Sequence, residues 1–112
     1  MGDFTAKSLI EGEIGGRVSR NPERAKKLGG IYEFVISGEG GGTWTVDLTA
    51  PLVKEGADPK MQVRIRMSND DFVAVATKKE DAMKFFLAKK IAVEGNLMLA
   101  MKLRDLLDPS GW

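Results

Sequence analysis

Apolar and polar residues alternate in three segments of the chain, strictly so in the third and with Val35 as an exception in the first. The apolar positions of these segments are Tyr32, Phe34 and Ile36, then Trp44, Val46 and Leu48, and then Val63, Ile65 and Met67. Because successive side chains of a strand point to opposite faces, the alternation predicts three strands in a sheet with one dry and one wet face. A sheet with one wet face is typical of antiparallel pairing.

Two further strands are predicted from shorter patterns. Leu52 and Val53 form a short apolar pair before the turn at residues 56–59, and Ile91 and Val93 alternate with polar neighbours near the C-terminus. Residues 38–42 read Gly-Glu-Gly-Gly-Gly, which is typical of a hairpin loop between two strands. A phosphate-binding loop would need a helix after the glycines, and an alternating strand pattern follows them here.

Helix signals lie on both sides of the strand segments. Asn21 suits the cap of a helix over residues 22–28, with Pro22 in its first turn and Gly29 at its exit. Ser68 predicts the cap of a second helix, and Glu80 with Asp81 predicts the start of a third. The order of helix, strands, two helices, strand and helix predicts an α+β fold with helices packed on one face of a mainly antiparallel sheet.

The last predicted helix, residues 96–107, carries two apolar arcs when drawn on a helical wheel. One arc holds Leu99, Ala100, Leu103, Leu106 and Leu107, and the other holds Leu97, Met98 and Met101. A helix lying on a sheet needs only one apolar arc. The second arc is therefore expected to face another element, a ligand or a partner, and methionine suits variable apolar shapes.

Residues 1–20 have no clear pattern and are expected to be a poorly defined N-terminal segment. Gly12, Gly15 and Gly16 interrupt the helical spacing of Leu9, Ile10 and Ile14, and each internal glycine costs a helix about 1 kcal/mol. We therefore expect the structured domain to span residues 21–112. A chain of 112 residues leaves room for one such domain.

The charge balance excludes one class of partner. The formal net charge is only +1, whereas a dedicated nucleic-acid-binding domain usually has a strong basic excess. The second half of the chain is more basic, with 10 Lys and Arg against 7 Asp and Glu in residues 60–112. This excess indicates either a solvated face or transient contact with anionic membranes. Nucleic acid is not an expected partner.

The residue types that most often perform catalysis are missing. The chain contains no Cys and no His, so thiolate chemistry, disulfides and the commonest transition-metal ligands are excluded. The acidic residues lie on the wet face, as Glu33 and Asp47 do, or at helix starts, as Asp70 and Asp71 do. We therefore expect a non-enzymatic protein with no catalytic residues, no metal site and no cofactor.

The expected location is the cytoplasm. No apolar run approaches the roughly 20 residues that cross a bilayer. The first residues also lack the basic and apolar regions of a secretory signal.

Four blocks of sequence resemble the sterol carrier protein type-2 domain family. These blocks are residues 26–34 (KKLGGIYEF), 43–48 (TWTVDL), 63–72 (VRIRMSNDDF) and the C-terminal signature in residues 85–86, 91–96 and 99–103. The resemblance implies a five-stranded sheet with helices around an apolar tunnel, which the C-terminal helix helps to cover. It also implies a ligand such as a fatty acid, fatty acyl-CoA, phospholipid or sterol-like lipid. The family usually has a longer N-terminal helix than the glycine-broken segment here allows.

Together the dry face and the resemblance predict a carrier that binds an apolar ligand in an internal cavity. The expected ligand-binding residues are Phe34, Ile36, Trp44, Val46, Leu48, Val63, Ile65, Met67, Phe72, Phe86, Leu97 and Met101. The alternative is an interaction or accessory module that docks its C-terminal helix on a partner enzyme or on itself. A monomer or a weak dimer fits both interpretations.

Overall fold

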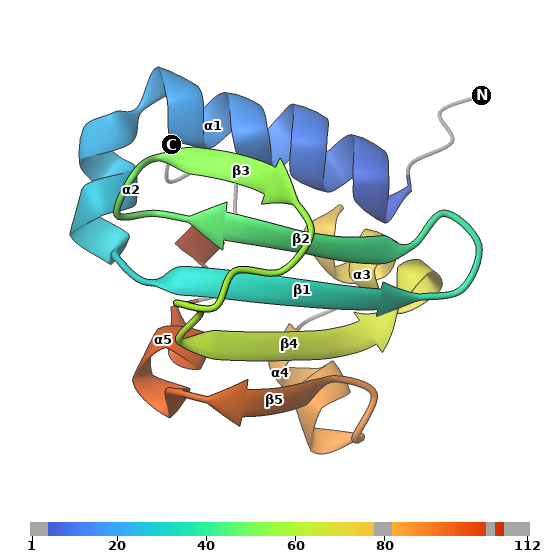
Figure 1. The fold of residues 1–112 in the computed structure, drawn as a ribbon. Helices are drawn as coiled ribbons and strands as arrows, with labels where there is room; N and C mark the ends of the chain where they lie inside the picture. Colours follow the sequence, from blue (N-terminus) through green and yellow to red (C-terminus); the bar gives the residue numbers. More distant parts are fainter. Residues whose placement is uncertain (1–4, 78–81, 103–104, 107–112) are drawn as a thin grey trace.

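Five strands form one sheet in the order β3-β2-β1-β4-β5 (Figure 1). The computed structural model describes residues 5–77, 82–102, 105 and 106. The strands are β1 (Ile31–Ser37), β2 (Gly42–Asp47), β3 (Leu52–Glu55), β4 (Val63–Ser68) and β5 (Ala92–Gly95). These positions confirm the five predicted strands and the hairpin loop between the first two. Two predicted strand residues lie just outside the observed strands: Leu48 follows β2 and Ile91 precedes β5, and both are buried in the same core.

The sheet is mixed, so the expectation of mainly antiparallel pairing needs one correction. β1 pairs antiparallel with β2, β2 with β3, and β4 with β5, but β1 and β4 run parallel. The chain crosses from the edge strand β3 back over the sheet to begin β4 beside β1 (Figure 1). Alternation reports which face of a strand is dry, and it carries no information about the direction of the neighbouring strand.

The helices cover one face and one edge of the sheet (Figure 1). They are η1 (Ser8–Ile14), α1 (Gly15–Arg20), α2 (Pro22–Leu28), α3 (Asn69–Ala76), α4 (Ala82–Leu87) and α5 (Leu97–Met101). The continuous helix made by η1 and α1 runs along β3, whereas α3 and α5 contact β4. The predicted α+β architecture is therefore confirmed.

The N-terminal segment differs from the expectation that its glycines would break a helix. The chain stays helical from Ser8 to Arg20, first as a π-helix and then as an α-helix. Gly15 donates its backbone N–H across the wider π turn to the carbonyl of Ile10. The apolar residues of this helix belong to the same hydrophobic cluster as the sheet; they are Leu9, Ile10, Ile14 and Val18.

Tertiary packing explains why the glycines are tolerated. Burying a Leu, Ile or Val side chain stabilises a protein by about 1.5–3 kcal/mol, whereas each internal glycine costs a helix about 1 kcal/mol. Four such side chains are buried here against three glycines. The sequence pattern alone could not show that a sheet face was available to receive them.

The local helix starts agree with the sequence predictions. The Asn21 side chain accepts a hydrogen bond from the backbone N–H of Arg24, and the Ser68 hydroxyl accepts one from the N–H of Asp71. The Asn96 side chain caps α5 by accepting from Met98 and Leu99. The predicted starts at Glu80 and Asp81, and the predicted helix beyond α5 at residues 103–104 and 107, lie outside the described residues.

The opposite face of the sheet is less wet at its centre than the alternation predicts. Glu33 and Thr45 stand opposite each other and are 3% and 0% exposed. Thr45 donates its hydroxyl to the carbonyl of Gly56, in the segment that crosses this face, and Arg64 pairs with Glu33. Glu33 and Asp47 are not opposite each other, because Asp47 faces Ile31 in the register. Two polar residues at the strand centres are therefore buried here, Thr45 by a covering loop and Glu33 with an ion pair.

One hydrogen bond fastens the N-terminal helix to the sheet, and it yields a prediction. The Trp44 indole N–H donates to the Glu11 carboxylate at 2.8 Å, and Trp44 is itself almost fully buried. Glu11→Ala should lower the free energy of unfolding by about 1–2 kcal/mol, because the indole N–H loses a charged acceptor. Urea unfolding followed by Trp fluorescence measures this change.

The matched control is Glu13→Ala, because Glu13 is exposed on the same helix. Surface substitutions of this kind change stability by about 0.5 kcal/mol or less. Equal losses for the two variants would contradict a specific role for the Glu11–Trp44 hydrogen bond.

Candidate functional site

The face of the sheet beneath the helices is apolar across its width. In the register, Phe34 stands opposite Trp44 on one side and Ile65 on the other, and Ile65 stands opposite Val93. Tyr32 stands between Val46 and Val63 in the next row. A ligand lying on this face would meet aromatic and branched aliphatic side chains from four adjacent strands.

The helices close this face with apolar side chains of their own. Phe72 of α3 packs edge to face against Phe34, with ring centroids 5.7 Å apart and ring planes at 78°. The N-terminal helix adds Ile10, Ile14 and Val18, and Leu106 near the C-terminus is also fully buried. The result is one continuous apolar layer between the sheet and the helices.

The structure brings nine of the twelve predicted ligand-binding residues into this layer. They are Phe34, Ile36, Trp44, Val46, Leu48, Val63, Ile65, Met67 and Phe72, all of them 5% exposed or less. Phe86, Leu97 and Met101 are instead 43% to 74% exposed on α4 and α5. The structure does not bring these three to the buried face, because Phe85 takes the inward side of α4, and Leu99 and Ala100 take the inward side of α5.

Polar contacts hold α5 in place. The Tyr32 hydroxyl donates to the carbonyl of Leu99 at 2.8 Å, and the Lys102 ammonium donates to the carbonyl of Leu28 at 3.0 Å. Gly30 adopts φ +94°, and a Cβ there would lie 2.9 Å from the methyl groups of Leu99. The inward side of α5 is thus fixed at a few points, while its larger apolar residues point outward.

Tyr32 has a strongly altered ionisation. Burial, followed by the negative charge of Asp105, raises the pKa of Tyr32 to about 12 from an ordinary value of 10.0. The neutral phenol is needed to donate to the carbonyl of Leu99. This group therefore supports the fold in its protonated form and takes no part in proton transfer near neutral pH.

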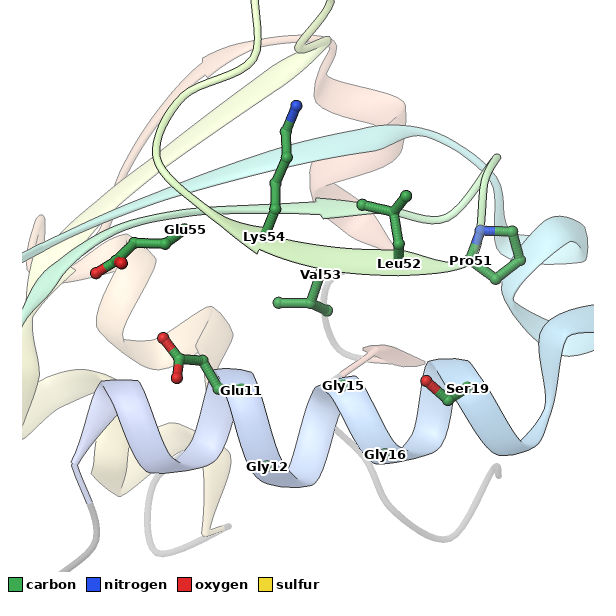
Figure 2. Close-up of a pocket in the computed structure, with 10 residues that line it drawn as sticks. All are labelled: Glu11, Gly12, Gly15, Gly16, Ser19, Pro51, Leu52, Val53, Lys54 and Glu55. Carbon is green, nitrogen blue, oxygen red and sulfur yellow. The ribbon is translucent and has the colours of Figure 1, made fainter.

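A surface groove of about 560 Å³ lies between the N-terminal helix and β3 (Figure 2). Gly12, Gly15 and Gly16 form its helical wall, with Glu11 and Ser19, and residues 51–55 form the other wall. Figure 2 shows Glu11 and Val53 directed between the helix and the strand, whereas Leu52 and Lys54 point away from the helix. The spacing of the three glycines was the sequence signal for this groove, and it indicated only a broken helix.

The chemistry of the groove does not suit an acidic lipid. Glu11 and Glu55 place two carboxylates along it, and Val53 is the apolar side chain directed into it. An anionic head group would be repelled there, and an acyl chain would find little apolar wall. The buried face of the sheet is the better candidate.

The described residues give no support to two other classes of site. Within the described ranges, no group of three or more acidic residues is placed to hold a metal ion. None of the helices in the described part of the chain is long and apolar enough to cross a membrane.

Comparisons with known proteins agree with this geometry. Residues 12–108 match the model of a family described as the SCP-2 sterol transfer family. Non-specific lipid-transfer protein-like 1 of Caenorhabditis elegans is 34% identical over 110 residues, which cover 95% of this chain and 92% of that protein. Sterol carrier protein 2 of Homo sapiens is 34% identical over 105 residues, which cover 88% of this chain but only 19% of that protein. The chain thus spans about a fifth of the human relative.

Two solved structures share the fold over nearly their whole length. The crystal structure of Sterol Carrier Protein 2 Like 2 from Aedes aegypti has a TM-score of 0.77 and 27% identity, and the match covers 88% of this chain and 93% of that one. The solution structure of palmitated SCP2L2 from the same organism has a TM-score of 0.78 and 25% identity. It covers 93% of this chain and 95% of that one.

The raised pKa of Tyr32 predicts a loss of stability at high pH. A raised folded-state pKa means that the stabilisation is complete below pH 10.0 and is lost as the pH rises toward about 12. The loss should reach about 2–3 kcal/mol. Because Tyr32 is the only tyrosine in the chain, tyrosinate absorbance should show a midpoint near 12 in the folded protein and near 10 in urea.

Tyr32→Phe is the control for this titration. The difference in unfolding free energy between the parent protein and Tyr32→Phe should be constant below pH 10.0 and shrink above it. A folded-state midpoint near 10 would contradict the burial of the phenol.

Proposed function

Because this chain belongs to the SCP-2 sterol transfer family, we propose that it binds one apolar lipid against the buried face of its sheet and carries that lipid between membranes. The observation that carries the proposal is the continuous apolar layer between sheet and helices. Its aromatic and aliphatic side chains suit an acyl chain, since burial of apolar area contributes about 25 cal/mol per Å² before binding costs. The role is binding and carriage, with no chemical step.

A fatty acyl chain is the favoured ligand class. The relative of known structure with a TM-score of 0.78 is described as palmitated, and it matches nearly the whole of this chain. A fatty acid, a fatty acyl-CoA and a phospholipid all carry such a chain, and a sterol-like lipid offers an apolar body of a different shape. The acyl chain would lie along the rows that contain Phe34 and Tyr32, beneath Phe72.

A buried cation offers a partner for the head group. Arg17 on α1 is 8% exposed, and its guanidinium donates to the carbonyl of Leu106 at 3.4 Å. A guanidinium has five N–H donors, so it can add a carboxylate to the contacts that it already makes. Arg17 would hold the carboxylate of a fatty acid at the junction of α1 with the C-terminal segment.

Contact quenching tests where the ligand lies. In Trp112→Phe, Trp44 is the only tryptophan, and it lies in the proposed ligand layer. A fatty acid brominated on its chain should quench Trp44 fluorescence on binding, and unlabelled palmitate should reverse the quenching. Native mass spectrometry of protein purified from cells should show a bound lipid of matching mass.

Two results would count against the proposal in different ways. If the brominated fatty acid displaced a fluorescent one but did not quench Trp44, the ligand would lie outside the proposed layer. Neither displacement nor a lipid adduct at micromolar concentration would contradict lipid binding itself.

The head-group role of Arg17 gives a separate prediction. Arg17→Gln should weaken palmitate binding about 10- to 100-fold, because a charge-assisted contact contributes about 1.5–3 kcal/mol. Binding of methyl palmitate, which has no carboxylate, should be unchanged. Arg20→Gln is the matched control, since Arg20 is exposed on the same helix.

Competition with a fluorescent fatty acid measures both affinities, and circular dichroism checks that each variant is folded. Equal weakening of palmitate and methyl palmitate binding in Arg17→Gln would mean that Arg17 supports the packing of the apolar layer and does not hold the head group.

A further inference from the structure

The outer surface of α4 and α5 exposes large apolar side chains. Six of them are at least 43% exposed: Met83, Phe86 and Leu87 on α4, and Leu97, Met98 and Met101 on α5. We call these six residues the α4–α5 face. A group of exposed apolar residues of this kind marks a surface that contacts a membrane or another molecule.

The two helices lie near opposite ends of β5 (Figure 1). Both are beside the β4–β5 side of the sheet (Figure 1), and β5 is the short strand that links them. α4 ends at Leu87 and α5 begins at Leu97, and nine residues lie between them, of which four form β5. A strand of four residues is only about 10–13 Å long, so one partner surface can meet both helices.

The charges beside this face are positive. Lys84, Lys89 and Lys90 are exposed on α4 and in the turn that follows it. Glu94 is the one acidic residue in residues 82–102, and it is engaged by Arg64 and Arg66 from β4. The hydrogen bond from Arg66 lowers the pKa of Glu94 below its ordinary value. Glu94 is thus paired with the two arginines of β4, and the described residues 82–102 hold no other carboxylate beside the three lysines.

A second copy of the chain would fit this face poorly. In a symmetric dimer the same patch meets itself, so the lysine clusters of two copies would be brought together. Like charges at an interface are unfavourable. A bilayer with anionic head groups offers the complementary arrangement, with acyl chains for the apolar residues and negative charge for the lysines.

We propose that the α4–α5 face docks this protein onto anionic lipid bilayers. The helices lie in the plane of the interface, with Leu87 and Met98, which are 73% and 75% exposed, inserted among the lipids. Lys84 and Lys89 contact the head groups. The purpose of docking rests on the proposed carrier function, since a carrier must reach a membrane to load or release its lipid.

Vesicle binding tests the proposal. The protein should co-sediment with phosphatidylcholine vesicles that contain phosphatidylglycerol, and should bind much more weakly to vesicles of phosphatidylcholine alone. Lys84→Gln/Lys89→Gln should lower the partition coefficient about thirtyfold, because each lysine contributes about 1 kcal/mol near an anionic surface. Leu87→Gln/Met98→Gln should lower it about tenfold or more. High salt should weaken binding of the parent protein.

The matched control is Leu52→Gln. Leu52 is also an exposed apolar residue, at 41%, but it lies on β3 at the opposite edge of the sheet. This substitution should leave vesicle binding unchanged. Equal effects of Leu52→Gln and Leu87→Gln/Met98→Gln would overturn the proposal.

Ligand binding in solution separates this proposal from the carrier function. Leu87 and Met98 are outside the proposed ligand layer, so Leu87→Gln/Met98→Gln should bind monomeric palmitate normally while its transfer between anionic vesicles slows. If the parent protein did not bind palmitate, the carrier function would be overturned and the vesicle result would still stand. Equal binding to neutral and anionic vesicles would overturn the docking proposal. The docking proposal would also be overturned if the protein did not bind vesicles and instead formed a concentration-dependent dimer that Leu87→Gln/Met98→Gln abolishes.

Discussion

Strand β1 sets the constraint on which the rest of the structure depends. It is the central strand of the sheet and pairs with a neighbour along both edges, so its side chains project onto two different faces. Tyr32, Phe34 and Ile36 all point to the helical side and are 4% exposed or less. Water can be kept from this row only by a second apolar layer. The N-terminal helix, α3 and the C-terminal segment exist in their observed positions because they supply that layer.

The layer is fastened by polar bonds at its margins. Glu11 ties the N-terminal helix to Trp44, and Tyr32 and Lys102 tie α5 to the sheet and to the end of α2. Directional bonds fix where a helix sits, while apolar packing alone would allow it to slide. The same arrangement leaves the larger apolar residues of α5 on the outside. The proposed ligand layer and the proposed membrane-docking surface are thus on two sides of the same short helix, α5.

The sequence by itself determined the features that depend on neighbouring residues. The alternation around Phe34, Trp44 and Ile65 identified the dry face, because a strand repeats every two residues whatever its surroundings. Asn21 and Ser68 marked helix starts, because a cap bonds within its own first turn. Eight of the twelve residues expected to bind the ligand could be placed together on this evidence, since membership of a dry face is a local property, and the ninth buried one, Phe72, comes from helix α3.

Only the tertiary structure decided what depends on distant partners. It made β1 and β4 parallel, kept the N-terminal helix intact through its glycines, buried Glu33 under Arg64, and turned Leu97 and Met101 outward. In each case the deciding group is remote in sequence. Strand β4 returns to β1 after the β2–β3 hairpin, and the N-terminal helix packs on a sheet that follows it in the chain. The Arg64 guanidinium is 31 residues from Glu33, and the Leu99 carbonyl that accepts from Tyr32 is 67 residues from it. The two apolar arcs of the last helix were visible in the sequence. The contacts of Tyr32, Gly30 and Lys102 decide which arc faces the core. An amphipathic pattern alone does not show which surface a helix will pack against.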